Sequence, residues 1–220
     1  MVTQVKHKYC DSAGKRLPSV TTIISRFKDS GALLYWANEQ GRNGLTLDEA
    51  RLPAATAGTM AHLLVEADLN GRELPKLEGD SDIIKKAHAA FNGYRQWSKL
   101  TSLEVLHTEV PLASEAHKFG GCLDAIGIVR NMSNGYAIVD WKSSNAIYAD
   151  YLYQLAAYKI LWEENYSDHP ITGGFHLCRF AKEAGDFCHN FYPSLDDEAE
   201  TFLAMRKLYD RVKTTEKRVR

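Results

Sequence analysis

The sequence YAIVDWK at residues 136–142 decides the fold, because a short apolar run ends there in Asp140, Trp141 and Lys142. A second strand-like run, residues 122–129, precedes it and carries Asp124. The residues between the runs, 131–135, are rich in asparagine, serine and glycine, which favour a turn. We expect a hairpin whose strands bring Asp124, Asp140 and Lys142 to one end.

Two carboxylates and a lysine at the end of a hairpin predict a metal-dependent reaction. Carboxylate oxygens are the ligands that Mg²⁺ or Mn²⁺ prefers, and such a metal polarises a phosphate and activates water. The ammonium group of Lys142 can stabilise the charge that develops on an attacked phosphate. These residue types therefore predict phosphodiester hydrolysis, with Mg²⁺ or Mn²⁺ as the cofactor.

Length and composition favour one soluble domain. Of the 220 residues 45% are hydrophobic, which is enough for one substantial core. We expect an N-terminal hairpin and helical region at 1–53, a catalytic core at 54–193 and a C-terminal helix at 194–220. The apolar runs are shorter than the ~18 residues of a membrane span, and no signal-peptide pattern is visible. A cytoplasmic protein without membrane contact is expected.

Cysteine spacing and net charge exclude several classes of protein. The four cysteines, Cys10, Cys122, Cys178 and Cys188, form no Cys-x-x-Cys pair, so neither a disulfide framework nor a zinc ribbon is expected. The net charge of −1 argues against a protein that coats nucleic acid by bulk electrostatics, but it permits an enzyme with one basic groove. The basic residues near the C-terminus, Lys213 among them, are expected on a solvated face.

Hydrophobic periodicity predicts helices first, then three strands, a helix, two strands and a last helix. That order is typical of an α/β (α+β) protein with a central mixed sheet flanked by helices. The expected helices cover residues 32–39, 54–69, 82–100, 148–166 and 195–214, with a further helix starting at Ser19 and one or two helical turns at 46–53. The expected strands cover residues 103–111, 119–130, 136–142, 171–180 and 187–192.

Two pairs of polar residues lie four positions apart, and therefore on one face of a helix. His62 and Glu66 can approach one metal ion, although such pairs are common on the polar face of an amphipathic helix. Gln154 and Tyr158 lie on the helix that follows the Asp140 strand. Tyr158 fits a core stripe, whereas a glutamine that faces the strand end needs a partner.

Four motifs occur in order: GTxxHxxxE at 58–66, GGxxD at 120–124, DWK at 140–142 and QxxxY at 154–158. Together they resemble the motifs of the RecB-like branch of the PD-(D/E)XK nuclease superfamily, over about residues 58–158. Residues 17–24, with Leu34 and Trp36, are similar to the N-terminal region of phage exonucleases and of the mitochondrial genome maintenance exonuclease. The resemblance implies a restriction-endonuclease-like core. Many relatives have glutamate where Asp140 stands.

The resemblance also implies a role for each matching residue. The metal ligands would be His62, Asp124, Asp140 and the backbone carbonyl of Trp141, with Glu66 supporting a second ion or its water shell. The implied catalytic set is Lys142, Asp140, Asp124, Glu109 and Gln154. The residues expected to contact DNA are Ser19, Thr21, Thr22, Trp36, Ser143, Gln154 and Tyr158, although a core position is the commoner role of a tryptophan. The cysteines do not flank the core as in relatives that hold an iron–sulfur cluster, so no cluster is expected.

The expected function is that of a metal-dependent DNA exonuclease acting on single- or double-stranded ends in recombination, repair or genome processing. A phage or bacterial source is favoured. A single-strand annealing or binding protein is a candidate partner, and the oligomeric state is left open. By analogy, helical residues 19–53 would form a gate for a DNA end. Two alternatives stay open: a catalytically silent DNA-binding or assembly module on the same fold, and a structure-selective endonuclease.

Overall fold

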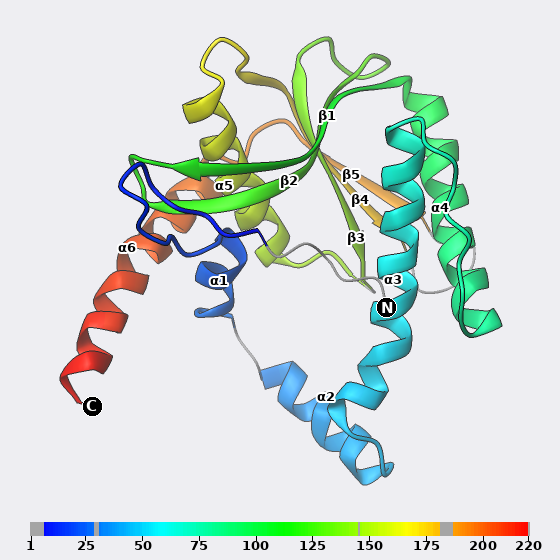
Figure 1. Cartoon of the computed structure of the whole chain (residues 1–220), viewed down its shortest axis with the longest axis horizontal. Coiled ribbons are helices and arrows are strands. Elements are labelled where there is room, and N and C mark those ends of the chain that lie inside the picture. Colours follow the sequence, from blue (N-terminus) through cyan, green and yellow to red (C-terminus); the bar gives the residue numbers. More distant parts are fainter. Residues whose placement is uncertain (1–6, 29–30, 145, 181–186, 220) are drawn as a thin grey trace.

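The computed structural model describes residues 7–28, 31–144, 146–180 and 187–219. Its centre is one five-stranded sheet in the order β1-β2-β3-β4-β5 (Figure 1). β3 and β4 run parallel, and the other neighbouring strands run antiparallel. The strands are β1 (Leu103–Ser114), β2 (Phe119–Val129), β3 (Tyr136–Ser143), β4 (Ile171–Phe180) and β5 (Phe187–Tyr192).

Helices cover both faces of this sheet. On one face, α1 (Val20–Ser25), α5 (Ala149–Asn165) and α6 (Asp196–Arg218) share a buried core with Leu123 and Ile138. On the other face, α3 (Leu47–Leu69) and α4 (Ser81–Thr101) share a second core with Val139 and Trp141. The expected α/β (α+β) class, a mixed sheet flanked by helices, is confirmed. In the described part of the chain, no helix combines the length and apolar character needed to cross a membrane.

One helical region stands apart from the sheet. α2 (Gly31–Arg42) and the N-terminal part of α3 extend away from the five strands, on the side where α1 lies (Figure 1). The chain reaches this region directly after α1 and returns to the sheet along α3. α2 and the first part of α3 therefore lie outside the two helical layers that pack on the sheet (Figure 1).

The start of α3 differs from the prediction. The sequence predicts one or two helical turns at 46–53 and a separate helix at 54–69. This prediction is wrong, because α3 is one continuous helix over Leu47–Leu69. Thr46 caps the amide of Glu49, and the Glu49 side chain accepts a hydrogen bond from the Thr46 N–H, which forms a capping box. Pro53 has no N–H donor, so it removes one helical hydrogen bond without ending the helix. The remaining helices and strands agree with the prediction to within a few residues.

Alternation along β3 decides which side chains face which layer. Ala137, Val139 and Trp141 belong to the core under α3 and α4, whereas Ile138 belongs to the core under α5. Because successive side chains of a strand point to opposite faces, Asp140 and Lys142 lie on the same face of the sheet as Ile138. The DWK sequence thus packs its tryptophan in one core and directs its acid and lysine to the opposite face.

Candidate active site

A cleft of about 1360 Å³ opens beside the end of the β2–β3 hairpin. The cleft is lined by residues of the N-terminal segment, of helices α1, α3, α5 and α6, and of strands β1 to β3. Asp140 is buried next to Lys142, and Trp36 on α2 is not one of the lining residues. The other expected site residues all line the cleft: Ser19, Thr21, Thr22, His62, Glu66, Glu109, Asp124, Trp141, Lys142, Ser143, Gln154 and Tyr158.

Asp140 and Lys142 form an ion pair at the centre of the site. The Lys142 Nζ lies 2.9 Å from Oδ1 and 2.7 Å from Oδ2 of Asp140. Burial raises the pKa of Asp140 to about 6, although the charge of Lys142 opposes this rise. Burial alone would lower the pKa of Lys142, but the carboxylates of Asp140 and Asp124 outweigh it and raise that pKa. Lys142 is therefore a protonated lysine beside two acids.

Asp124 reaches the same place from β2. The β2–β3 ladder ends at the pair Ala125 and Val139, so the edge of β3 from Asp140 onward is not paired with β2. The Trp141 N–H instead donates a hydrogen bond to Oδ2 of Asp124, with 3.1 Å between nitrogen and oxygen. Because the N–H and C=O of a residue in a strand point to the same side, the Trp141 carbonyl also faces Asp124. Burial raises the pKa of Asp124, against the opposing effect of Lys142.

Helix α3 brings His62 and Glu66 to the cleft. Gly58 permits this close approach, because a Cβ at that position would lie 2.1 Å from Oγ of Ser143 on β3. Burial, helped by the charge of Lys142, lowers the pKa of His62 to about 4. The imidazole is therefore neutral at neutral pH and keeps a lone pair that can bind a metal. Glu66 pairs with Arg72, whose Nη2 is 2.6 Å from its Oε1.

Glu109 stands opposite Asp124 in the β1–β2 ladder, since the residues on either side of both acids pair with one another. Its φ of 47° lies in the left-handed region, which residues other than glycine rarely adopt. Two main effects raise the pKa of Glu109 to about 7: the larger is partial desolvation in the cleft, and the smaller is repulsion from the charge of Asp124. Backbone strain and a like-charged neighbour are both common at functional sites.

Helix α5 supplies the remaining polar groups. The Gln154 amide donates to the Tyr158 hydroxyl, with 2.6 Å between Nε2 and the oxygen. The Lys142 ammonium lies 5.4 Å from the centre of the Tyr151 ring, within the range of a cation–π contact. Gly121 lets α5 approach β2, because a Cβ there would lie 2.8 Å from the Tyr158 ring and 3.1 Å from Val20. Tyr158 is thus a core residue whose hydroxyl reaches the site.

The donor atoms at the centre fit a hard divalent cation. Oδ2 of Asp140 is buried and accepts no hydrogen bond of good geometry from any described residue, even though Nζ of Lys142 is near. The Lys142 ammonium, 2.7 Å away, already offsets the charge of this oxygen, so a bound cation would share it with the lysine. Among the described residues, however, the three potential ligands whose donor atoms lie within 4.8 Å of one another are His7, Glu109 and Cys122. The ligand set His62, Asp124 and Asp140 is less closely grouped and stays a prediction.

Several cleft residues were not found from the sequence. His7, Tyr151 and Tyr209 line the cleft, and Cys122 lines it two positions before Asp124 on the same face of β2. That spacing of two was a usable signal for Cys122. Lys213 was expected on a solvated face; it is exposed but also lines the cleft from α6. Its approach depends on how α6 packs against the sheet, which the local sequence does not specify.

No family model matches the sequence, and no curated protein matches it. Several solved structures are similar to it over part of its length, among them the following two. A candidate exonuclease from Eubacterium rectale is 12% identical with a TM-score of 0.46, over 69% of this chain and 64% of that one. The chain thus spans just under two thirds of that protein. SSO0001 is 15% identical with a TM-score of 0.32, over 69% of this chain and 70% of that one. Similarity at this level assigns no function.

Proposed function

We propose that the chain is a divalent-metal-dependent deoxyribonuclease that hydrolyses phosphodiester bonds from DNA ends. One observation carries the proposal: the ammonium of Lys142 is held beside the carboxylates of Asp140 and Asp124, at the open edge of β3 on a large cleft. Two acids and a lysine in this arrangement suit attack on a phosphate. The motif resemblance over residues 58–158 supports the same assignment.

Each side chain at the centre of the cleft would have a distinct role in hydrolysis. Asp124, Asp140, His62 and the Trp141 carbonyl would hold a Mg²⁺ or Mn²⁺ ion, which when bound polarises the phosphate and lowers the pKa of a water molecule. Lys142 would hold the attacking water or a phosphate oxygen by hydrogen bonds, and its fixed charge offsets the negative charge that develops in the transition state. Asp140 keeps Lys142 protonated and positions its ammonium.

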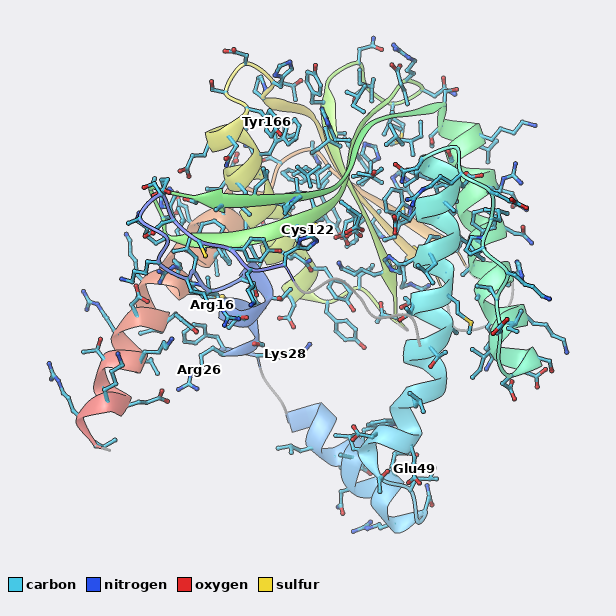
Figure 2. All side chains as sticks on the ribbon, viewed as in Figure 1. Arg16, Arg26, Lys28, Glu49, Cys122 and Tyr166 are labelled. Atoms are coloured by element: carbon cyan, nitrogen blue, oxygen red, sulfur yellow. The ribbon has the colours of Figure 1, made fainter. Side chains whose placement is uncertain are left out.

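A DNA strand in the cleft would meet both hydroxyl and basic groups. Ser19, Thr21 and Thr22 line it from the start of α1, and Arg16 and Lys213 add positive charge. Figure 2 shows Arg16 close to α1, and Arg16 and residues of α1 both line the cleft. Local charge of this kind is what a protein with a net charge of −1 needs to attract a polyanion. Trp36 would contact only a strand that extends beyond the cleft.

We propose the preference for DNA ends by analogy with the exonucleases that the motifs resemble. α1, α2 and the first half of α3 would form a gate through which a free strand enters, within a single catalytic domain. A catalytically silent DNA-binding module would have lost the lysine or one of the acids, and this chain keeps all three. A structure-selective endonuclease would need no free end, which makes the two enzyme types easy to distinguish.

Digestion of matched linear and covalently closed circular DNA in Mg²⁺ tests the proposal. We expect the wild-type protein to degrade the linear DNA and spare the circle, and Asp140→Asn to lose cleavage while keeping its circular dichroism spectrum. Asp82→Asn, which removes an exposed acid on α4, is the control and should cleave like wild type. Cutting of the circle would indicate the endonuclease. DNA binding without cleavage of either substrate would indicate the silent module.

A further inference from the structure

A second group of metal-binding side chains lies in the same cleft. His7 from the N-terminal segment, Glu109 from β1 and Cys122 from β2 have donor atoms that all lie within 4.8 Å of one another. All three line the cleft, so a cation can reach them from solvent. Figure 2 shows Cys122 on the side of β2 along which the N-terminal segment runs. The group differs from the acids around Lys142 in containing a thiol.

The donor types select a softer metal than Mg²⁺. Thiol and imidazole groups are ligands for Zn²⁺, whereas Mg²⁺ prefers oxygen atoms and water. A tetrahedral zinc ion with bonds of about 2.3 Å to sulfur and about 2.0 Å to oxygen separates those two atoms by about 3.5 Å. The Cys122 thiol donates a hydrogen bond to Glu109 with 3.5 Å between Sγ and Oε2, so zinc would replace the shared proton at the same separation. This pair therefore already has the separation that a shared zinc ion requires.

The segment that carries His7 is fixed against β2 close to Cys122. The Tyr9 carbonyl accepts a hydrogen bond from the Leu17 N–H at 2.9 Å, and the Gly120 N–H donates to the Pro18 carbonyl at 3.0 Å. The Tyr9 ring packs where a Cβ of Gly120 would be, since such an atom would lie 2.3 Å from it. The imidazole thus starts near its metal-bound position, which lowers the cost of ordering it.

We propose that His7, Glu109 and Cys122 form a zinc site, with water as the fourth ligand, that regulates the cleft. Binding of Zn²⁺ forms a zinc–thiolate bond, and the thiol proton passes to solvent. The ion would engage Glu109, which stands opposite Asp124, and place two positive charges next to the acids around Lys142. Zinc should therefore inhibit cleavage. Zinc binding itself is independent of the proposed nuclease function, whereas the inhibition rests on it.

Cobalt substitution followed by zinc competition tests the site directly. In the full chain, Co²⁺ should give the near-ultraviolet charge-transfer absorption of a thiolate ligand, and Zn²⁺ should abolish it. Cys122→Ser should remove this band. Cys122→Ser, and separately His7→Asn, should weaken zinc affinity at least about 100-fold in competition with a chromogenic chelator, because loss of even an outer-shell partner costs 10–100-fold. The matched controls are Cys10→Ser and His88→Asn, which alter exposed residues elsewhere and should bind zinc like wild type.

The outcomes separate this site from the proposed function. If Asp140→Asn loses DNA cleavage but keeps the cobalt band, the zinc site is independent of the catalytic acids, as proposed. A cobalt band that survives Cys122→Ser, or unchanged zinc affinity in His7→Asn, would overturn the zinc site whatever the nuclease assay shows. If Cys122→Ser lowers the melting temperature in the absence of metal, the zinc affinity of His7→Asn alone decides whether the site exists, because His7 lies on an N-terminal segment outside the core.

Discussion

The backbone N–H of Trp141 donates a hydrogen bond to the side chain of Asp124, two residues beyond the last β2–β3 pair on β3. The Trp141 ring is itself packed edge-on against Tyr94 of α4, with 5.8 Å between ring centres. The carboxylate of Asp124 is therefore positioned by a backbone group whose own side chain is anchored in the core. This arrangement holds Asp124 at the open edge of β3, beside Asp140 and Lys142, before any ligand arrives.

Close packing of α5 on β2 gives a prediction about stability. Gly121→Ala should lower the free energy of unfolding by about 1–3 kcal/mol, because its Cβ would lie 2.8 Å from Tyr158 and 3.0 Å from Leu161 in a packed core. Gly41→Ala is the matched control: nothing lies within 4 Å of a Cβ there, and α2 should gain about 0.5–1 kcal/mol from the better helix former. Urea unfolding followed by circular dichroism measures both changes. Equal stability of the two variants would contradict this packing.

The hairpin and its three central residues could be predicted because they depend on local sequence. Alternation in YAIVDWK determines which side chains share a face, and the turn residues at 131–135 make β2 and β3 neighbours. Contacts between distant segments could not be predicted in this way. The position of Glu109 opposite Asp124 depends on the β1–β2 register, and the approach of His7 and Lys213 depends on how the two ends of the chain pack.

The raised pKa of Glu109 predicts how stability depends on pH. Its pKa is 4.5 ordinarily and about 7 in the fold, so between these values the folded state holds the proton more tightly than the unfolded state does. The contribution of Glu109 to the stability of the metal-free protein should therefore fall as pH rises from about 4.5 to about 7, whereas the lowered pKa of His62 acts in the opposite direction. Buried Asp140, with a pKa of about 6, acts in the same direction as Glu109.

Glu109→Gln isolates that effect. The melting temperature of the variant minus that of wild type should increase as pH rises over the same range, with both proteins measured in chelator. Glu78→Gln, which alters an exposed glutamate outside the cleft, should follow the wild-type curve. Parallel curves for wild type and Glu109→Gln would show that Glu109 keeps its ordinary pKa.

The basic residue contributed by α6 predicts how DNA binding depends on salt. If a DNA phosphate lies against Lys213, then Lys213→Ala should weaken the binding of DNA of any sequence. It should also reduce the slope of log affinity against log salt concentration by about 0.7–0.9. Fluorescence anisotropy with a labelled strand in chelator measures this without cleavage. Lys217→Ala, one turn further along α6 and outside the cleft, should leave the slope unchanged. Equal slopes for wild type and Lys213→Ala would exclude this path for the DNA.

The rate of cleavage after replacement of Lys142 tests the central claim most directly. Lys142→Met keeps the bulk of the side chain and removes the charge that lies beside Asp140 and Asp124. We expect single-turnover cleavage of an end-labelled linear strand in Mg²⁺ to slow at least about 100-fold, the usual effect of losing one charge-stabilising donor. Lys159→Met, which alters a lysine on α5 paired with Asp196, should cleave at the wild-type rate. A wild-type rate in Lys142→Met would contradict the account.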